Sequence, residues 1–236
     1  MADQPKRFYK EVTVEPGPEG FGLTLDGRPL KTPAKALFLL PSAALAEAIA
    51  EEWDAQDDKI DSSTMPLTSL GFTALDRIKP DPEGMKAEML RYARTDLVCY
   101  RADRPQELAE AQALAWDPLI DWIRAETGLS LKVTAGIVPV EQPDDTIPTI
   151  DRYIAEWDPF RLTSLSVATA SAGSLVIALA LVRRHLDPQA AFEAAMVDET
   201  YQVSHWGDDD EASERRANVR LDLEAAARLV TLLEPH

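Results

Sequence analysis

The chain has little cysteine and few basic residues, and both shortages exclude classes of function. Cys99 is the only cysteine among 236 residues, so no internal disulfide can form and no cysteine-rich metal site exists, which suits a reducing compartment. Acidic residues outnumber basic ones by 41 to 24, the formal charge is -17, and no basic cluster is visible. Nucleic acids and anionic membrane surfaces are therefore disfavoured as partners, whereas a basic or apolar protein surface fits better.

The motifs of common catalytic and cofactor sites are also missing. The sequence has no Gly-x-Ser-x-Gly elbow, and its glycine-rich segment Gly17–Gly22 lies in an expected hairpin without a helix behind it, so it predicts no phosphate-binding loop. None of the three histidines has a Glu, His or Cys partner at metal-ligand spacing. We therefore expect no catalytic residues, no metal and no cofactor, and a binding protein rather than an enzyme.

No targeting or membrane-spanning segment is predicted. The N-terminal residues lack both the apolar core of a signal peptide and a long Arg- and Ser-rich presequence, which predicts cytoplasmic residence. The stretch Leu162–Val182 carries no charge and is long enough to cross a bilayer, but hydroxyl residues interrupt its first half. We interpret it as a central helix surrounded by other helices. A membrane-associated protein that uses this stretch is the alternative.

The N-terminal part, residues 1–62, is typical of a small antiparallel sheet with one helix. Apolar and polar residues alternate before and after a turn-forming segment, and Asp26-Gly27 is a strong hairpin signal. A short strand is expected around Leu37–Leu40. Ser42 is expected to cap a helix that buries every third or fourth residue after it.

The C-terminal part, residues 63–236, is predicted to be a larger, mostly α-helical bundle, so the fold class is α+β. Four Asp-Pro pairs each precede a helical pattern, with Asp at the cap and Pro at the first helical position. These pairs are Asp81-Pro82, Asp117-Pro118, Asp158-Pro159 and Asp187-Pro188. Further helices are expected at Leu67–Ile78, Pro105–Ala115 and Ser213–Leu233, and short extended stretches at Leu97–Tyr100 and Leu131–Val138.

The candidate binding site lies on the helix expected after Asp187-Pro188. Its apolar positions, from Phe192 to Trp206, share one face, and Glu199 falls in the middle of that face, flanked by Asp198 and Gln202. A carboxylate on a buried face is costly unless it is paired. One interpretation is an internal ion pair with an arginine of the next helix, which the pattern alone favours. The candidate arginines are Arg215, Arg216 and Arg220.

Two functional interpretations of this site remain beside the ion pair. The first is a partner-binding surface made of Asp198, Glu199, Gln202 and Trp206, which awaits a cation or an amide from another protein. The second is an enzyme with an unfamiliar site around Glu199, Gln202 and His205.

The ordered motifs of the whole chain resemble those of one known family, the assembly chaperones of the α subunit of the catalytic head of F-type ATP synthase. That family comprises mitochondrial ATP synthase assembly factor two and its bacterial relatives. The motifs are Arg7–Lys10 (RFYK), Leu25–Pro33 (LDGRPLKTP), Glu52–Gln56 (EWDAQ), Met65–Thr68 (MPLT), Tyr92–Leu97 (YARTDL), Cys99–Ala102 (CYRA), Gln112 with Trp116–Pro118 (WDP), Gly173–Leu175 (GSL), Asp198-Glu199, Tyr201-Gln202 and Trp206-Gly207.

This resemblance implies a fold and a function. It implies a small N-terminal α/β domain before a larger helical domain. It also implies a molecular chaperone that binds the unassembled α subunit, prevents its aggregation and hands it on to the β subunit. The family's functional acidic residue falls in the pair Asp198-Glu199, and either residue could be its counterpart. The missing presequence indicates a bacterial, cytoplasmic member, whereas eukaryotic relatives act in the mitochondrial matrix. We expect a monomer when the protein is free, without stable membrane insertion.

Overall fold

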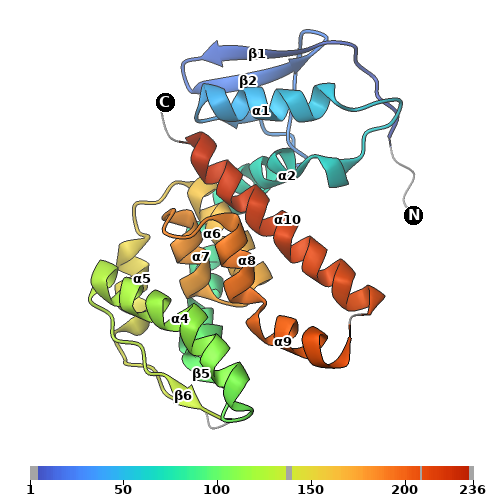
Figure 1. The fold of residues 1–236 in the computed structure, drawn as a ribbon. Coiled ribbons are helices and arrows are strands. Elements are labelled where there is room, and N and C mark those ends of the chain that lie inside the picture. Colours follow the sequence, from blue (N-terminus) through green and yellow to red (C-terminus); the bar gives the residue numbers. More distant parts are fainter. Residues whose placement is uncertain (1–4, 137–139, 208, 234–236) are drawn as a thin grey trace. The chain divides into compact units, whose positions relative to one another are not determined.

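Alternating apolar residues build a small antiparallel sheet at the start of the chain, as predicted. The computed structural model describes residues 5–136, 140–207 and 209–233 (Figure 1). The turn at Asp26-Gly27 joins two of the strands, and the central strand buries Leu23 and Leu25. The first strand pairs with the second, and the second also pairs with the third and fourth. The strands are β1 (Val12–Gly17), β2 (Gly20–Leu25), β3 (Arg28–Pro29) and β4 (Leu39–Leu40).

The predicted helix after Ser42 covers this sheet and is capped as expected. The Ser42 hydroxyl accepts a hydrogen bond from the Leu45 amide at 3.2 Å, which satisfies one of the free N–H groups at the start of α1 (Ala43–Asp54). Helix α1 packs on β1 and β2 and buries Leu45, Ile49 and Trp53. The next helices along the chain are the 3-10 turn η1 (Ser62–Thr64), α2 (Pro66–Thr73) and the π-helical turn η2 (Ala74–Ile78).

Helices dominate the remaining chain, so the predicted α+β fold class is confirmed. The short strands β5 and β6 form a parallel pair. The expected extended stretch Leu97–Tyr100 is a 3-10 helix up to Cys99, because Asp96 caps a helical turn there by accepting a hydrogen bond from the Val98 amide. Residues 137 and 138 of the expected stretch Leu131–Val138 lie outside the described residues. The elements are α3 (Pro82–Leu90), η3 (Arg91–Arg94), η4 (Leu97–Cys99), β5 (Tyr100–Arg101), α4 (Gln106–Thr127), β6 (Thr134–Ala135), α5 (Thr146–Tyr153), α6 (Pro159–Ala172), α7 (Leu175–Val182), α8 (Pro188–Ala195), α9 (Val197–Trp206) and α10 (Asp210–Leu233).

One of the four Asp-Pro predictions is wrong. Helix α4 begins at Gln106 and continues through Pro118, so Asp117-Pro118 does not start a helix. A proline inside a helix loses one backbone hydrogen bond, which costs about 3 kcal/mol. The burial of Trp116 and Leu119 beside it offsets this loss. The prediction is correct at Asp158 and Asp187, whose carboxylates accept hydrogen bonds from the first turns of α6 and α8.

The uncharged stretch Leu162–Val182 forms two helices rather than one. The backbone at Gly173 has a φ of 66°, a left-handed conformation that ends α6. Ser174 then caps α7 by accepting a hydrogen bond from the Ile177 amide at 3.1 Å. All 8 residues of α7 are buried, which confirms the prediction of a buried helix there. Within the described part of the chain, no helix combines the length and apolar character needed to cross a membrane.

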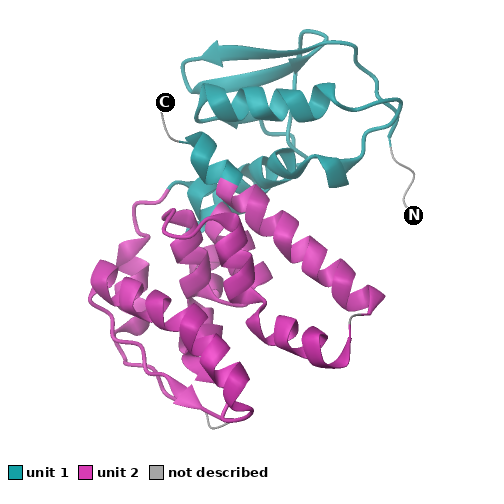
Figure 2. Ribbon diagram, viewed as in Figure 1, with its two compact units in different colours: residues 1–82, 158–163, 228–236 teal, residues 83–157, 164–227 magenta. Residues whose placement is uncertain are grey.

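The chain divides into two compact units (Figure 2). Unit 1 contains residues 1–82, 158–163 and 228–236, and unit 2 contains residues 83–157 and 164–227. Unit 1 therefore gathers the sheet and α1 together with two segments from much later in the sequence. The boundary at residue 62, as the limit of an N-terminal domain, stays a prediction.

Candidate functional site

The segment that carries the predicted site is two helices, not one. Helix α8 ends at Ala195, and Met196 leaves the helical conformation with φ and ψ of -107° and 20° before α9 begins. Helix α8 buries Phe192 and three alanines, whereas α9 buries none of its residues. The expectation of one apolar face running from Phe192 to Trp206 is therefore wrong, because the turn at Met196 reorients α9. Figure 1 shows α9 following α8 and leading on to α10.

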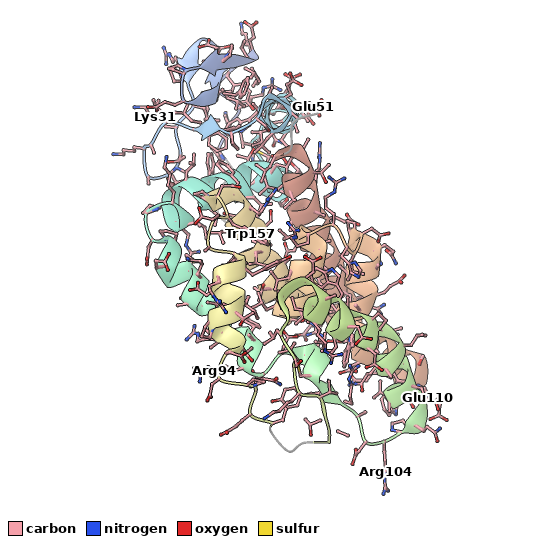
Figure 3. All side chains as sticks on the ribbon, turned by 90° about the vertical axis from the view of Figure 1, so that its left-hand side faces the viewer. Lys31, Glu51, Arg94, Arg104, Glu110 and Trp157 are labelled. Atoms are coloured by element: carbon pink, nitrogen blue, oxygen red, sulfur yellow. The ribbon has the colours of Figure 1, made fainter. Side chains whose placement is uncertain are left out.

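Asp198 is held by a buried amide of α4. The Gln112 side chain donates a hydrogen bond from Nε2 to Asp198 Oδ1 at 2.6 Å, and its Oε1 accepts one from the Ala102 amide at 2.7 Å. Gln112 is 3% exposed, so its amide has little access to water. Glu110, labelled in Figure 3, lies in the same stretch of α4. Both ends of the Gln112 amide are thus used, and they join α9 to the chain segment that follows β5.

A second layer of contacts fixes the stretch of α4 around Gln112. The Arg101 guanidinium donates to the backbone carbonyl of Gln112 at 2.6 Å and to the Asp117 carboxylate at 2.9 Å. It also lies 4.9 Å from the centre of the Trp116 ring, within the range of a cation–π contact. Burial lowers the pKa of Arg101, and Asp117 acts in the opposite direction. The fully buried Trp116 in turn donates from its indole to the Ala194 carbonyl at 2.7 Å.

Glu199 forms an ion pair with Arg215 of α10, as one interpretation of the sequence expected. The pair is not buried, however, because the Glu199 side chain is 27% exposed and the Arg215 side chain 60%. Arg220, another of the candidate arginines, lies over the Phe192 ring at 4.0 Å and donates to Gln189. The Glu199 carboxylate is therefore partly accessible to solvent.

The remaining predicted site residues lie at the exposed side and end of α9. Gln202 is exposed, and Trp206 is 77% exposed, so Trp206 does not share a buried face with Phe192. His205 stacks on Tyr201 with ring centres 4.1 Å apart, and its Nδ1 lies 2.9 Å from the Tyr201 carbonyl oxygen. At spacings of three and four residues, Glu199, Gln202 and Trp206 share one face of the helix. This face combines a carboxylate, an amide and a large exposed aromatic ring.

Two buried carboxylates were missed by the sequence reasoning, and both cap helices. Asp96 is fully buried and accepts hydrogen bonds from the Ser174 hydroxyl at 2.5 Å and from the Leu175 and Val176 amides at 2.8 and 3.1 Å. Burial raises the pKa of its carboxyl to about 6, against the opposing effect of these hydrogen bonds. Asp96 thus holds the start of α7 from 78 residues away in the sequence.

Glu52 plays the corresponding part in unit 1. Its carboxylate accepts hydrogen bonds from the Leu67 and Thr68 amides, both at 2.8 Å, and from the Thr68 hydroxyl at 2.7 Å. Burial raises the pKa of the Glu52 carboxyl, and the bonds to Thr68 and Leu67 oppose that shift. This carboxylate takes the place of a side-chain cap for α2, whose own Met65 cannot supply one. Glu52 lies in the motif EWDAQ and its partners Leu67 and Thr68 lie in MPLT, but the spacing of the two motifs alone does not indicate the contact.

A hollow in unit 2 lies apart from the predicted residues. It has a volume of about 650 Å³ and is lined by Arg94 (labelled in Figure 3), Tyr100 and residues of the segment 140–148. None of Asp198, Glu199, Gln202 and Trp206 lines it. Across the described residues, no group of three or more His, Cys, Asp or Glu side chains is placed to hold a metal ion.

Comparison with known proteins identifies the family. Residues 6–124 match the model of the ATP12 chaperone protein family. The crystal structure of Atp12 from Paracoccus denitrificans is similar, with a TM-score of 0.93 and 37% identity over 98% of this chain and 99% of that one. A variant of the Paracoccus protein with one aspartate replaced by lysine gives the same TM-score and identity, with 98% of each chain covered.

A putative chaperone from Agrobacterium tumefaciens is similar as well. Its crystal structure has a TM-score of 0.92 and 39% identity over 98% of this chain and 87% of that one. The resemblance deduced from the motifs is therefore confirmed: the chain belongs to the ATP12 chaperone family.

Proposed function

We propose that this protein is an assembly chaperone of F-type ATP synthase. It binds the unassembled α subunit of the catalytic head, prevents its aggregation and hands it on to the β subunit. Membership of the ATP12 chaperone family carries this proposal. An unassembled subunit exposes the apolar surface that its neighbour later covers, and such a surface is prone to aggregate.

We propose α9 as the α-subunit-binding element, with Asp198, Glu199, Gln202 and Trp206 as its contact residues. The observation that supports this choice is that α9 buries none of its residues yet presents two carboxylates and a tryptophan that is 77% exposed. Carboxylates steer a basic partner and give specificity, while an exposed tryptophan supplies contact area. A chaperone must also release its client, for which steered binding of moderate affinity is better suited than a large apolar clamp.

The proposal includes what the protein does not do. We propose that it catalyses no reaction, needs no cofactor, binds no nucleic acid and acts as a monomer in the cytoplasm without stable membrane insertion. The net charge of -17 supports the absence of nucleic-acid binding and of stable membrane insertion, because it repels phosphate backbones and anionic lipid surfaces. The same charge keeps a complex with an aggregation-prone subunit soluble.

Co-expression with the ATP synthase α subunit tests the proposal. The protein should co-purify with the α subunit and should suppress the light scattering that the isolated α subunit produces on warming. Purified β subunit, added to the complex, should displace it. If the α subunit scatters light equally with and without the protein and never co-purifies with it, the proposed function is wrong.

A further inference from the structure

The two neighbouring carboxylates of α9 are held in different ways. Asp198 accepts its hydrogen bond from Gln112, an uncharged group of α4 that is 3% exposed. Glu199 is paired with Arg215, whose side chain is 60% exposed and comes from the following helix. Only the partner of Glu199 is therefore charged and accessible to solvent. Of the two carboxylates, Glu199 is the one whose partner another molecule can replace.

From this arrangement we propose that Arg215 occupies, in the free protein, the place on Glu199 that an arginine of the bound partner takes over. The inference rests on the proposed function, since it concerns the same surface, and it adds the chemistry of the partner group and a competitor within the chain. The exchange replaces one guanidinium by another. Glu199 is therefore paired both before and after binding, and no carboxylate is buried alone.

The chemistry of the α9 face favours an arginine over other groups. Arg215 itself demonstrates that a guanidinium reaches the Glu199 carboxylate. On the same face, Gln202 offers an amide and Trp206 an aromatic ring that is 77% exposed. Guanidinium groups form paired hydrogen bonds with carboxylates and stack on aromatic rings, which the compact ammonium of lysine does less well. A partner segment with arginines one or two helical turns apart would contact both ends of this face.

The pair is also weak enough to be exchanged. Ion pairs between exposed side chains contribute little to stability, because water and salt screen them and two long side chains must be ordered. The side chain of Arg215 is mostly exposed, so its removal leaves no cavity. Its loss should therefore free Glu199 without unfolding α9, which Asp198 and Gln112 still hold.

The test compares Arg215→Gln with the wild-type full-length protein in binding to purified ATP synthase α subunit. We expect about two- to fivefold tighter binding by calorimetry, the gain that follows from removing one exposed ion pair that competes with the client. Arg124→Gln is the matched control, because Arg124 is a half-exposed arginine of the same unit that pairs with Asp121. It makes the same change of charge and should leave the affinity unchanged, as should the conservative Arg215→Lys within about twofold.

A second measurement does not need the α subunit. Arginine amide is titrated into each protein while the NMR signals of Glu199 and Trp206 are followed. The shifts should saturate at a two- to fivefold lower concentration in Arg215→Gln than in the wild type. Equal concentrations in both proteins, or unchanged α-subunit affinity in Arg215→Gln, would overturn the exchange. If the wild type never binds the α subunit but the arginine titration behaves as expected, the exchange stands and the proposed client is wrong.

Discussion

Replacing Gln112 by leucine should destabilise the protein by about 2–4 kcal/mol, because its amide joins α4 to two other segments. Leucine has nearly the same size but can form neither hydrogen bond. The Ala102 amide would lose its acceptor at 2.7 Å, which costs about 1–3 kcal/mol for a poorly hydrated group. Asp198 would lose its 2.6 Å donor, normally worth about 1.5–3 kcal/mol for a charged acceptor. The partial exposure of Asp198 reduces the second contribution, since water can replace the amide.

Urea unfolding followed by circular dichroism measures this loss as a lower midpoint at unchanged slope. Gln106→Leu is the control, since Gln106 is exposed and its side chain bonds to Glu110 on the same helix. It should change the stability by less than about 0.5 kcal/mol. Equal midpoints for the two variants would refute the reasoning, because they would show that the Gln112 amide does not hold Asp198 and Ala102 together.

Three further predictions concern the helix caps and α9. Burial raises the Asp96 pKa to about 6 from 3.8, so the folded state binds its proton more tightly than the unfolded chain does. The stability of the wild type relative to Asp96→Asn should therefore rise by about 2 kcal/mol as the pH falls from about 7 to about 4, measured by denaturant unfolding at each pH. Glu52→Ala should lower stability by about 2–4 kcal/mol in thermal unfolding, because two amides and a hydroxyl lose their acceptor. Trp206→Ala should change the melting temperature by less than about 2 °C, given its exposure, but should weaken α-subunit binding in a pull-down.

The sequence predicts those parts of the fold that depend on neighbouring residues. The hairpin at Asp26-Gly27 and the cap at Ser42 are encoded within a few positions, and both are present. The same holds for Asp187, whose carboxylate bonds to an amide three residues later. The helix through Pro118 shows the limit of such rules, since the burial of its neighbours outweighs the local preference.

The candidate site was less accessible to sequence reasoning, because its geometry depends on distant contacts. The turn at Met196 carries no glycine or proline to mark it, so one continuous helix with Glu199 on a buried face was the natural expectation. Gln112 lies 86 residues from Asp198, and no spacing rule links them. The ion pair of Glu199 with Arg215 could be foreseen from charge and proximity in sequence, but not that water reaches both side chains.

The central claim is that Glu199 of α9 binds the client rather than holds the fold. Glu199→Lys tests it most directly, because the melting temperature and α-subunit capture are measured on one variant. Since the ion pair with Arg215 is exposed, the loss of stability should stay below about 1 kcal/mol. Glu88→Lys, at an exposed position of α3, is the control with the same change of charge. We predict that Glu199→Lys melts like this control but no longer captures the α subunit. Undiminished capture, or a melting temperature that collapses together with capture, would contradict the account.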